Sequence, residues 1–172
     1  FQADSGFVRR NKSVDRIIQE VSTAHKKMNF GLIQFTDDNF LARQPKEMDE
    51  FFERWTNEIK VPYWMNTCIE TVNEHNLPQL KKSGCVGIGI GMETGSDWVR
   101  KNLLLKGKMN NEFYMEKFGL IAKHGIRSTS NSMIGTPGEH EEDFFETIKL
   151  NKAIREINRD LTSFDITYIA PY

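Results

Sequence analysis

The stretch that decides the fold is Cys85-Val86-Gly87-Ile88-Gly89-Ile90-Gly91-Met92-Glu93-Thr94-Gly95-Ser96. An apolar run of this length, bounded by Ser83-Gly84 and by a polar loop, is typical of a buried strand. Side chains alternate between the two faces of a strand, so three glycines and Glu93 are expected on one face and the isoleucines on the other. One face is therefore bare until a carboxylate appears at its rim.

Two explanations of the bare face stay open. A helix could pack closely against the glycines and leave Glu93 solvated, or a bulky ligand or another backbone could lie there. We favour a ligand, because a helix contact is more often made through Ala or Ser. The dinucleotide-binding fingerprint does not apply, since Thr94 stands where its third glycine belongs and the glycines lie in the strand rather than in the turn after it. The phosphate-binding loop of the Walker type is also absent.

Outward from this stretch, apolar segments of strand length alternate with amphipathic helical segments. This alternation predicts an α/β fold with a parallel sheet in a single domain over 1–172. An open doubly wound sheet and a full or partial barrel of βα units both fit, and both bind ligands at the carboxyl ends of their strands. The predicted strands are 32–35, 63–67, 85–91, 126–134 and 164–169, and the predicted helices are 13–28, 45–59, 71–82, 110–124 and 139–157.

One of these strands carries polar residues where a parallel sheet normally has Val, Ile and Leu. The strand from Arg127 to Gly135 contains Ser, Thr and Asn, and each such group buried without a partner costs roughly 1–3 kcal/mol. A hydrated ladder of hydroxyls and a polar ligand remain alternatives. Asp37 and Asp38 end the first strand, where they could bind a metal, act as bases, hold ribose hydroxyls or simply form a loop.

Composition excludes several classes of protein. Lys and Arg total 23 against 24 Asp and Glu, so the net charge of -1 gives no field that would attract nucleic acid or anionic lipid. No apolar run reaches the length of a membrane span. Cys68 and Cys85 have no partners at metal-ligand spacing, which predicts neither zinc nor a disulfide framework and favours the cytoplasm. Because the chain starts at Phe1, we expect a fragment of a longer protein.

Four segments together resemble the radical S-adenosylmethionine superfamily, and in particular its branch with an N-terminal cobalamin-binding domain. They are Phe35–Phe40, Gly91–Ser96, Met133–Glu139 and Tyr168–Tyr172. The resemblance implies a parallel-stranded, TIM-like partial (βα)6 barrel, truncated here to about five strands. It also places the first strand and the CxxxCxxC loop, which holds the 4Fe-4S cluster, before Phe1. Cys68 and Cys85 do not match that loop, so no metal ligand is expected in this chain and the fragment alone is expected to be inactive.

The same resemblance implies the residues that contact S-adenosylmethionine, while no catalytic side chain is assigned. Glu93 and Ser96 match the loop that binds the ribose or the amino group. The methionine carboxylate and ribose would be held by Arg127, Ser130 and Asn131. The adenine would be contacted by Met133, Ile134, Gly135, Ile169, Ala170 and Pro171. The methionine moiety or the substrate would lie near Asp37 and Asp38.

For the intact protein the resemblance implies a radical enzyme, either an oxidoreductase or a methyltransferase. An electron donor would reduce the cluster, S-adenosylmethionine would be cleaved to a 5'-deoxyadenosyl radical, and a small-molecule substrate would lose a hydrogen atom. With cobalamin, the outcome would be methyl transfer or oxidative cyclisation. The alternatives are a cofactor-free α/β module that binds a sugar or nucleotide and a purely structural role for the polar strand. Without the upstream strand, residues 32–35 would form an open edge, which predicts dimers.

Overall fold

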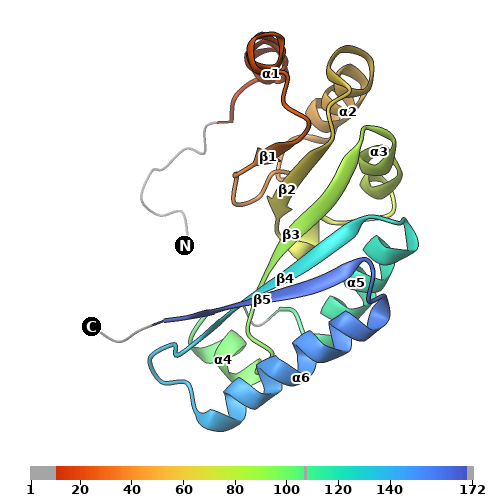
Figure 1. Cartoon of the computed structure of the whole chain (residues 1–172). Coiled ribbons are helices and arrows are strands. Elements are labelled where there is room, and N and C mark those ends of the chain that lie inside the picture. Colours follow the sequence, from red (N-terminus) through yellow and green to blue (C-terminus); the bar gives the residue numbers. More distant parts are fainter. Residues whose placement is uncertain (1–10, 107, 170–172) are drawn as a thin grey trace.

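The computed structural model describes residues 11–106 and 108–169, which form one five-stranded parallel sheet in the order β1-β2-β3-β4-β5 (Figure 1). Each strand is hydrogen-bonded to its neighbours in the sequence order. The strands are β1 Ile33–Phe35, β2 Tyr63–Thr67, β3 Cys85–Glu93, β4 Arg127–Ile134 and β5 Thr162–Tyr168.

The helices connect these strands and begin at side chains that can cap them. Ser13 and Asn110 accept hydrogen bonds from backbone N–H groups at the starts of α1 and α5, as their positions in the sequence predict. The helices are α1 Val14–Met28, α2 Pro45–Arg54, α3 Asn76–Lys82, α4 Asp97–Asn102, α5 Asn111–Lys123 and α6 Glu141–Ile157; the π-helical turn η1, Trp55–Ile59, continues α2, and the 3-10 turn η2 is Ile69–Thr71.

The strand order decides between the two architectures that the sequence left open. In a doubly wound sheet the strand order reverses and helices cover both faces. Here the order never reverses, and within residues 11–106 and 108–169 the helices lie on one face while the other carries none (Figure 1). Consecutive parallel strands that are crossed over on one side form the wall of a barrel. The chain is therefore a partial TIM-like barrel of five strands.

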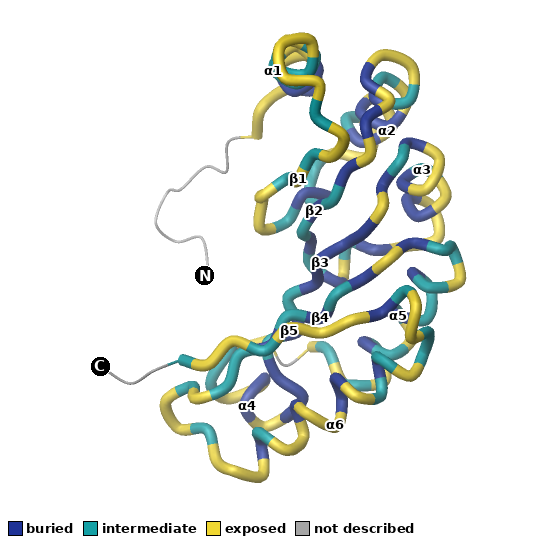
Figure 2. The backbone as a smooth tube through the Cα atoms, in the orientation of Figure 1, coloured by how far each residue is buried: buried dark blue, intermediate teal, exposed yellow. Residues whose placement is uncertain are grey.

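The apolar core lies between the sheet and the helices. Tyr63, Met65, Ile88 and Ile90 are buried on the helix-facing side of the two central strands, as the alternation predicts. Phe51, Trp55, Phe118, Ile121 and Ile154 from the helices complete the same cluster. Buried residues are concentrated along this face in Figure 2, whereas β5 and the outer helix surfaces are exposed.

One predicted helix is shorter than its apolar pattern indicated. The helix expected over 71–82 is an α-helix only from Asn76. The side chain of Asn73 accepts hydrogen bonds from the backbone N–H groups of His75 and Asn76, both at 3.0 Å. An Asn side chain that bonds the backbone ahead of it favours a turn over helix, so the helix begins after this loop.

Both outer strands leave one edge without a strand partner among the described residues. β1 pairs only with β2, and β5 pairs only with β4. Leu32, directly before β1, has 55% of its surface exposed. In the described part of the chain, no helix combines the length and the apolar character that crossing a membrane requires.

Candidate functional site

The three glycines of β3 make room for side chains of the neighbouring strands. A Cβ built on Gly87 would overlap the ring of Trp64, and one on Gly89 would overlap Oδ1 of Asn66. At Gly91 the Cβ would lie 2.6 Å from Oε1 of Glu93. The interpretation that a helix packs on the glycines is wrong, because the helices cover the opposite face (Figure 1). Two side chains of β2 and the carboxylate of Glu93 therefore lie over the three glycines, on the concave face of the sheet opposite the helices.

Polar side chains continue this concave face across the sheet. Residues level with one another on paired strands share a face, and Gly91 is level with Asn131, which is level with Asp165. One row lower, the hydroxyl oxygens of Thr129 and Ser163 lie 2.7 Å apart. The concave face is thus closed by Trp64 near the amino ends of the strands and lined by amides and carboxylates toward the carboxyl ends.

Glu93 lies at the carboxyl end of β3, where the pairing with β4 is irregular between Gly91 and Glu93. Its φ of 69° falls in the left-handed region, which a glutamate adopts only when its surroundings enforce it. The carboxylate turns back over Gly91, and its Oε1 accepts a hydrogen bond from Nζ of Lys106 at 3.2 Å. The Glu93 side chain keeps only 21% of its surface exposed, so the carboxylate faces the concave surface rather than bulk solvent.

Ser130 faces the helices rather than the concave face, and its predicted contact with a cofactor stays a prediction. Side chains alternate along β4, so Ser130 and Asn131 point in opposite directions. Ser130 is fully buried and donates a hydrogen bond to Oδ1 of Asn151 on α6 at 2.6 Å. The amide of Asn151 donates in turn to Oγ of Ser132 at 2.9 Å. These serines are satisfied by a helix, and neither water nor a ligand is required.

Arg127 lies at the amino end of β4, whereas the other predicted site residues of this strand lie nearer its carboxyl end. It begins β4 level with Gly87, whereas Glu93 is level with Ser132. Five residues of strand separate the two levels, which is roughly 17 Å. Arg127 is thus distant from Glu93 along the strands, and its predicted contact with the methionine carboxylate or ribose stays a prediction.

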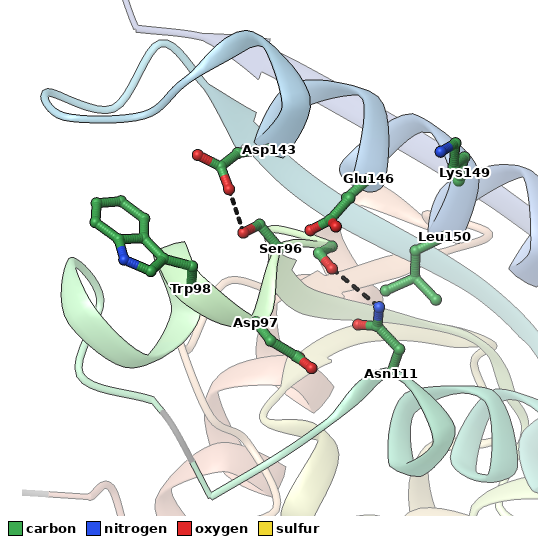
Figure 3. Close-up of a pocket in the computed structure, with 9 residues that line it drawn as sticks. Ser96, Asp97, Trp98, Asn111, Asp143, Glu146, Lys149 and Leu150 are labelled. Carbon is green, nitrogen blue, oxygen red and sulfur yellow. Dashed lines mark hydrogen bonds between the residues drawn. The ribbon is translucent and has the colours of Figure 1, made fainter.

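Ser96 is also turned toward the helices. It is fully buried, its Oγ accepts a hydrogen bond from the N–H of Val99 at 3.2 Å, and the same hydroxyl donates to Oδ1 of Asp143. Figure 3 shows this pair at the edge of a depression of about 520 Å³ that Trp98 and Asn111 also line. Ser96 therefore caps α4 on the helix side of the sheet, and its predicted contact with the cofactor stays a prediction.

The other residues from the sequence lie around the carboxyl ends of the strands. Asp37 and Asp38 are exposed in the turn after β1. Met133 and Ile134 are half-buried at the end of β4, and the carbonyl of Ile134 accepts a hydrogen bond from the N–H of Ile169 at 2.8 Å. Ala170 and Pro171 lie outside the described residues.

The backbone at Gly135 is held within the chain. Gly135 has a φ of 83°, and its N–H donates to Oε2 of Glu139 at 2.6 Å. The N–H of Thr136 donates to the same oxygen at 3.0 Å, so the Gly135 amide is already bonded.

Three contributors to the site were not found from the sequence. Asn66 and Asp165 lie on the concave face, as the alternation of side chains along their strands requires. The sequence would have indicated both residues only if the pairing of the strands had been known. Lys106 reaches Glu93 from an irregular loop, and no sequence pattern indicated that contact.

The described residues contain no group of three or more His, Cys, Asp and Glu side chains arranged to hold a metal ion. Cys85 is buried at the start of β3, whereas Cys68 follows the end of β2. Burial raises the pKa of the Cys85 thiol to about 12, so this thiol stays neutral at physiological pH.

Comparison with known proteins agrees with this architecture, because residues 2–150 match the radical SAM superfamily. This chain belongs to that superfamily. An uncharacterized methyltransferase of Pyrococcus horikoshii is 26% identical over 167 residues, which are 95% of this chain and 34% of the relative. The chain therefore spans about a third of the length of this curated relative.

Solved radical SAM structures share the fold. TsrM from Kitasatospora setae, a radical S-adenosylmethionine methyltransferase with cobalamin and a 4Fe-4S cluster bound, superimposes with a TM-score of 0.73 at 14% identity. The match covers 91% of this chain and 31% of TsrM. Coproporphyrinogen III oxidase (HemN) from Escherichia coli superimposes with a TM-score of 0.67 at 11% identity. This match covers 95% of this chain and 39% of HemN.

Proposed function

We propose that this chain forms the S-adenosylmethionine-binding wall of a radical SAM enzyme, with the cofactor on the concave face at the carboxyl ends of the strands. The observation that carries the proposal is the glycine row of β3, which ends in a carboxylate on the face that has no helix. Membership of the superfamily supplies the class of cofactor. A purely structural reading of the glycines leaves the strained backbone of Glu93 without a purpose.

The residues present fit such a molecule. Asn66 lies over Gly89 and Glu93 lies over Gly91, so amide and carboxylate groups, rather than apolar side chains, line this part of the concave face. In this arrangement the Glu93 carboxylate accepts hydrogen bonds from ribose hydroxyls or from an ammonium group, and Asn131 offers both a donor and an acceptor.

Further contacts lie around the same strand ends. Asp37 and Asp38 approach from the turn after β1 toward the methionine moiety or substrate. Met133, Ile134, Gly135 and Ile169 offer the adenine an apolar and backbone surface. Ala170 and Pro171, which lie outside the described residues, are proposed for the adenine from the sequence alone.

The chemistry itself belongs to the cofactors. A 4Fe-4S cluster held by an upstream segment, once reduced by an electron donor, would supply the electron that cleaves S-adenosylmethionine. This chain would bind and orient the sulfonium compound and keep water from it. For the outcome we propose methyl transfer to a small-molecule substrate with cobalamin held by another part of the protein, because the curated relative is named a methyltransferase and TsrM holds cobalamin.

Substitution of Glu93 tests the proposal. In the intact protein with its cluster reconstituted without oxygen, Glu93→Gln is expected to raise the Kd for S-adenosylmethionine by about tenfold, which corresponds to one lost charge-assisted hydrogen bond. The matched control is Glu74→Gln, because Glu74 is an exposed glutamate that bonds His124. An unchanged Kd in Glu93→Gln would remove Glu93 from the site. Binding of a sugar or nucleotide by this chain, independent of any cluster, would favour a cofactor-free binding module instead.

We also propose the cytoplasm as the location, since an oxygen-sensitive cluster suits a reducing compartment. The open edge of β1 is proposed to receive the upstream part of the same polypeptide. Where that part is absent, the same edge would pair with a second copy of the chain.

A further inference from the structure

Arg100 lies behind the loop that carries Glu93, on the helix side of the sheet. Its side chain is only 1% exposed. One terminal nitrogen of the guanidinium donates to the carbonyl of Thr94 and to Oδ1 of Asn111, both at 2.7 Å. The other donates to Asp97 and to the carbonyl of Met109, the latter at 3.3 Å. A buried charge is tolerated only when it is paired in this way, so the position of Arg100 is fixed by many contacts.

These contacts fix the backbone next to Glu93. Thr94 follows Glu93 directly, and its carbonyl is one of the groups that Arg100 holds. Asn111, which also bonds Arg100, donates from Nδ2 to the carbonyl of Gly95 at 2.9 Å, as Figure 3 shows. Gly95 in turn approaches the backbone of Glu146 so closely that a Cβ would overlap it. The loop is thus clamped just where Glu93 needs a left-handed conformation.

Arg100 also contacts the partner of the Glu93 carboxylate. The backbone carbonyl of Arg100 accepts a hydrogen bond from the N–H of Lys106 at 2.8 Å. Nζ of Lys106 then reaches Oε1 of Glu93 at 3.2 Å. The side chain of Arg100 bonds the loop next to Glu93, and the backbone carbonyl of Arg100 bonds Lys106. Arg100 therefore contacts the chain on both sides of the Glu93–Lys106 ion pair.

We propose that Arg100 is a positioning residue that keeps the Glu93 carboxylate on the concave face. The consequence for cofactor affinity rests on the function proposed above, whereas the effect on Glu93 does not. A merely structural role is the alternative, in which Arg100 packs over the ring of Tyr114 at 5.2 Å and stabilises α4 and α5 without influence on the carboxylate.

Zero-length crosslinking with a carbodiimide tests the position of Glu93 directly, because this reagent joins a carboxylate only to an amine that touches it. The intact protein is expected to yield a Glu93–Lys106 crosslinked peptide by mass spectrometry. Arg100→Gln is expected to lose most of this product and Arg100→Lys to retain part of it. The matched control is Arg155→Gln, because Arg155 also donates to a backbone carbonyl, that of Thr162 at 2.8 Å, far from Glu93 in the sequence.

Folding of each variant is checked by circular dichroism. If Arg100→Gln folds and gives the wild-type yield of crosslink, the proposal is overturned. If Arg100→Gln does not fold, Arg100→Lys decides, since a yield equal to wild type overturns the proposal and a reduced yield supports it.

Cofactor affinity supplies the second measurement, by equilibrium dialysis of S-adenosylmethionine against the intact protein with an oxidised cluster. Arg100→Gln is expected to raise the Kd by about tenfold in the wild-type background and by little in the Glu93→Gln background, because residues that act through one contact are not additive. Equal effects in both backgrounds would overturn the proposal. If Glu93→Gln alone leaves the Kd unchanged, the proposed function fails at this residue, while the crosslink still decides the role of Arg100.

Discussion

Trp64 and Gly87 offer the most direct test of why β3 lacks side chains on its concave face. An alanine Cβ at Gly87 would fall on the six-membered ring of Trp64, too close for any small shift to relieve. The indole must therefore leave the face of β3. Forcing extra volume into a packed site costs roughly 1–3 kcal/mol. Alanine is favoured over glycine in an ordinary strand by about 0.5–1 kcal/mol, which offsets part of that cost. The expected net loss for Gly87→Ala is about 1–2 kcal/mol in the free energy of unfolding.

A double-mutant cycle isolates this contact. The free energy of unfolding is measured in urea by far-UV circular dichroism for wild type, Gly87→Ala, Trp64→Ala and the double variant. Once the indole is absent, Gly87→Ala is expected to be neutral or to stabilise the chain by up to about 1 kcal/mol, which gives a coupling energy of about 1–3 kcal/mol. Gly119→Ala is the control, because a Cβ there meets nothing within 4 Å, and loss of a helix glycine is expected to stabilise α5 by about 0.5–1 kcal/mol. Equal destabilisation by Gly87→Ala with and without Trp64 would refute the reasoning.

Two further predictions concern the ends of the sheet. Burial raises the pKa of the Cys85 thiol from 9.0 to about 12, so the unfolded chain loses this proton at a lower pH than the folded chain. The stability that the neutral thiol contributes is therefore fully present below pH 9 and is lost as the pH rises toward 12. Between these pH values, the free energy of unfolding measured in urea is expected to fall by about 1.4 kcal/mol per pH unit more in wild type than in Cys85→Ala. Parallel pH profiles of the two proteins would contradict a raised pKa of Cys85. The open edge of β1 predicts dimers of this 172-residue chain by light scattering at micromolar concentration, which Leu32→Lys should weaken; a wild-type monomer throughout that range would exclude edge pairing.

The elements of the fold were predictable because apolar spacing carries most of the signal. The strands at 63–67 and 85–93 and the capped starts of α1 and α5 follow from alternation and from cap residues. The strand order did not follow, since both candidate architectures share the same alternation of strands and helices. Only the pairing of β1 through β5 in sequence distinguishes them, and pairing depends on contacts between residues far apart in the chain.

The position of a site residue was predictable where we applied the rule that side chains alternate between the two faces of a strand. Where we did not apply this rule, the prediction grouped residues that face opposite sides. Glu93 was placed on the glycine face by that rule, and it lies there. Ser130 and Asn131 were grouped together although adjacent strand residues face opposite sides, and Arg127 was included although it starts its strand. The roles of Lys106 and Arg100 depend on a loop and a short helix that fold back on β3, and no local pattern encodes such a return.

The two faces of the sheet explain why a glycine row is compatible with a stable chain. A closed barrel fills its interior with layers of side chains, and that packing contributes to its stability. In this chain the apolar layer lies on the helix side, where Ile88, Ile90 and Met92 are buried, so β3 keeps its core without help from the concave face. The curvature of a barrel wall brings the inward side chains of adjacent strands together, and only a strand without Cβ atoms at Gly87 and Gly89 lets Trp64 and Asn66 cross it. Apolar packing is therefore confined to the helix side of β3, which leaves its concave side free to carry the amide of Asn66 and the carboxylate of Glu93.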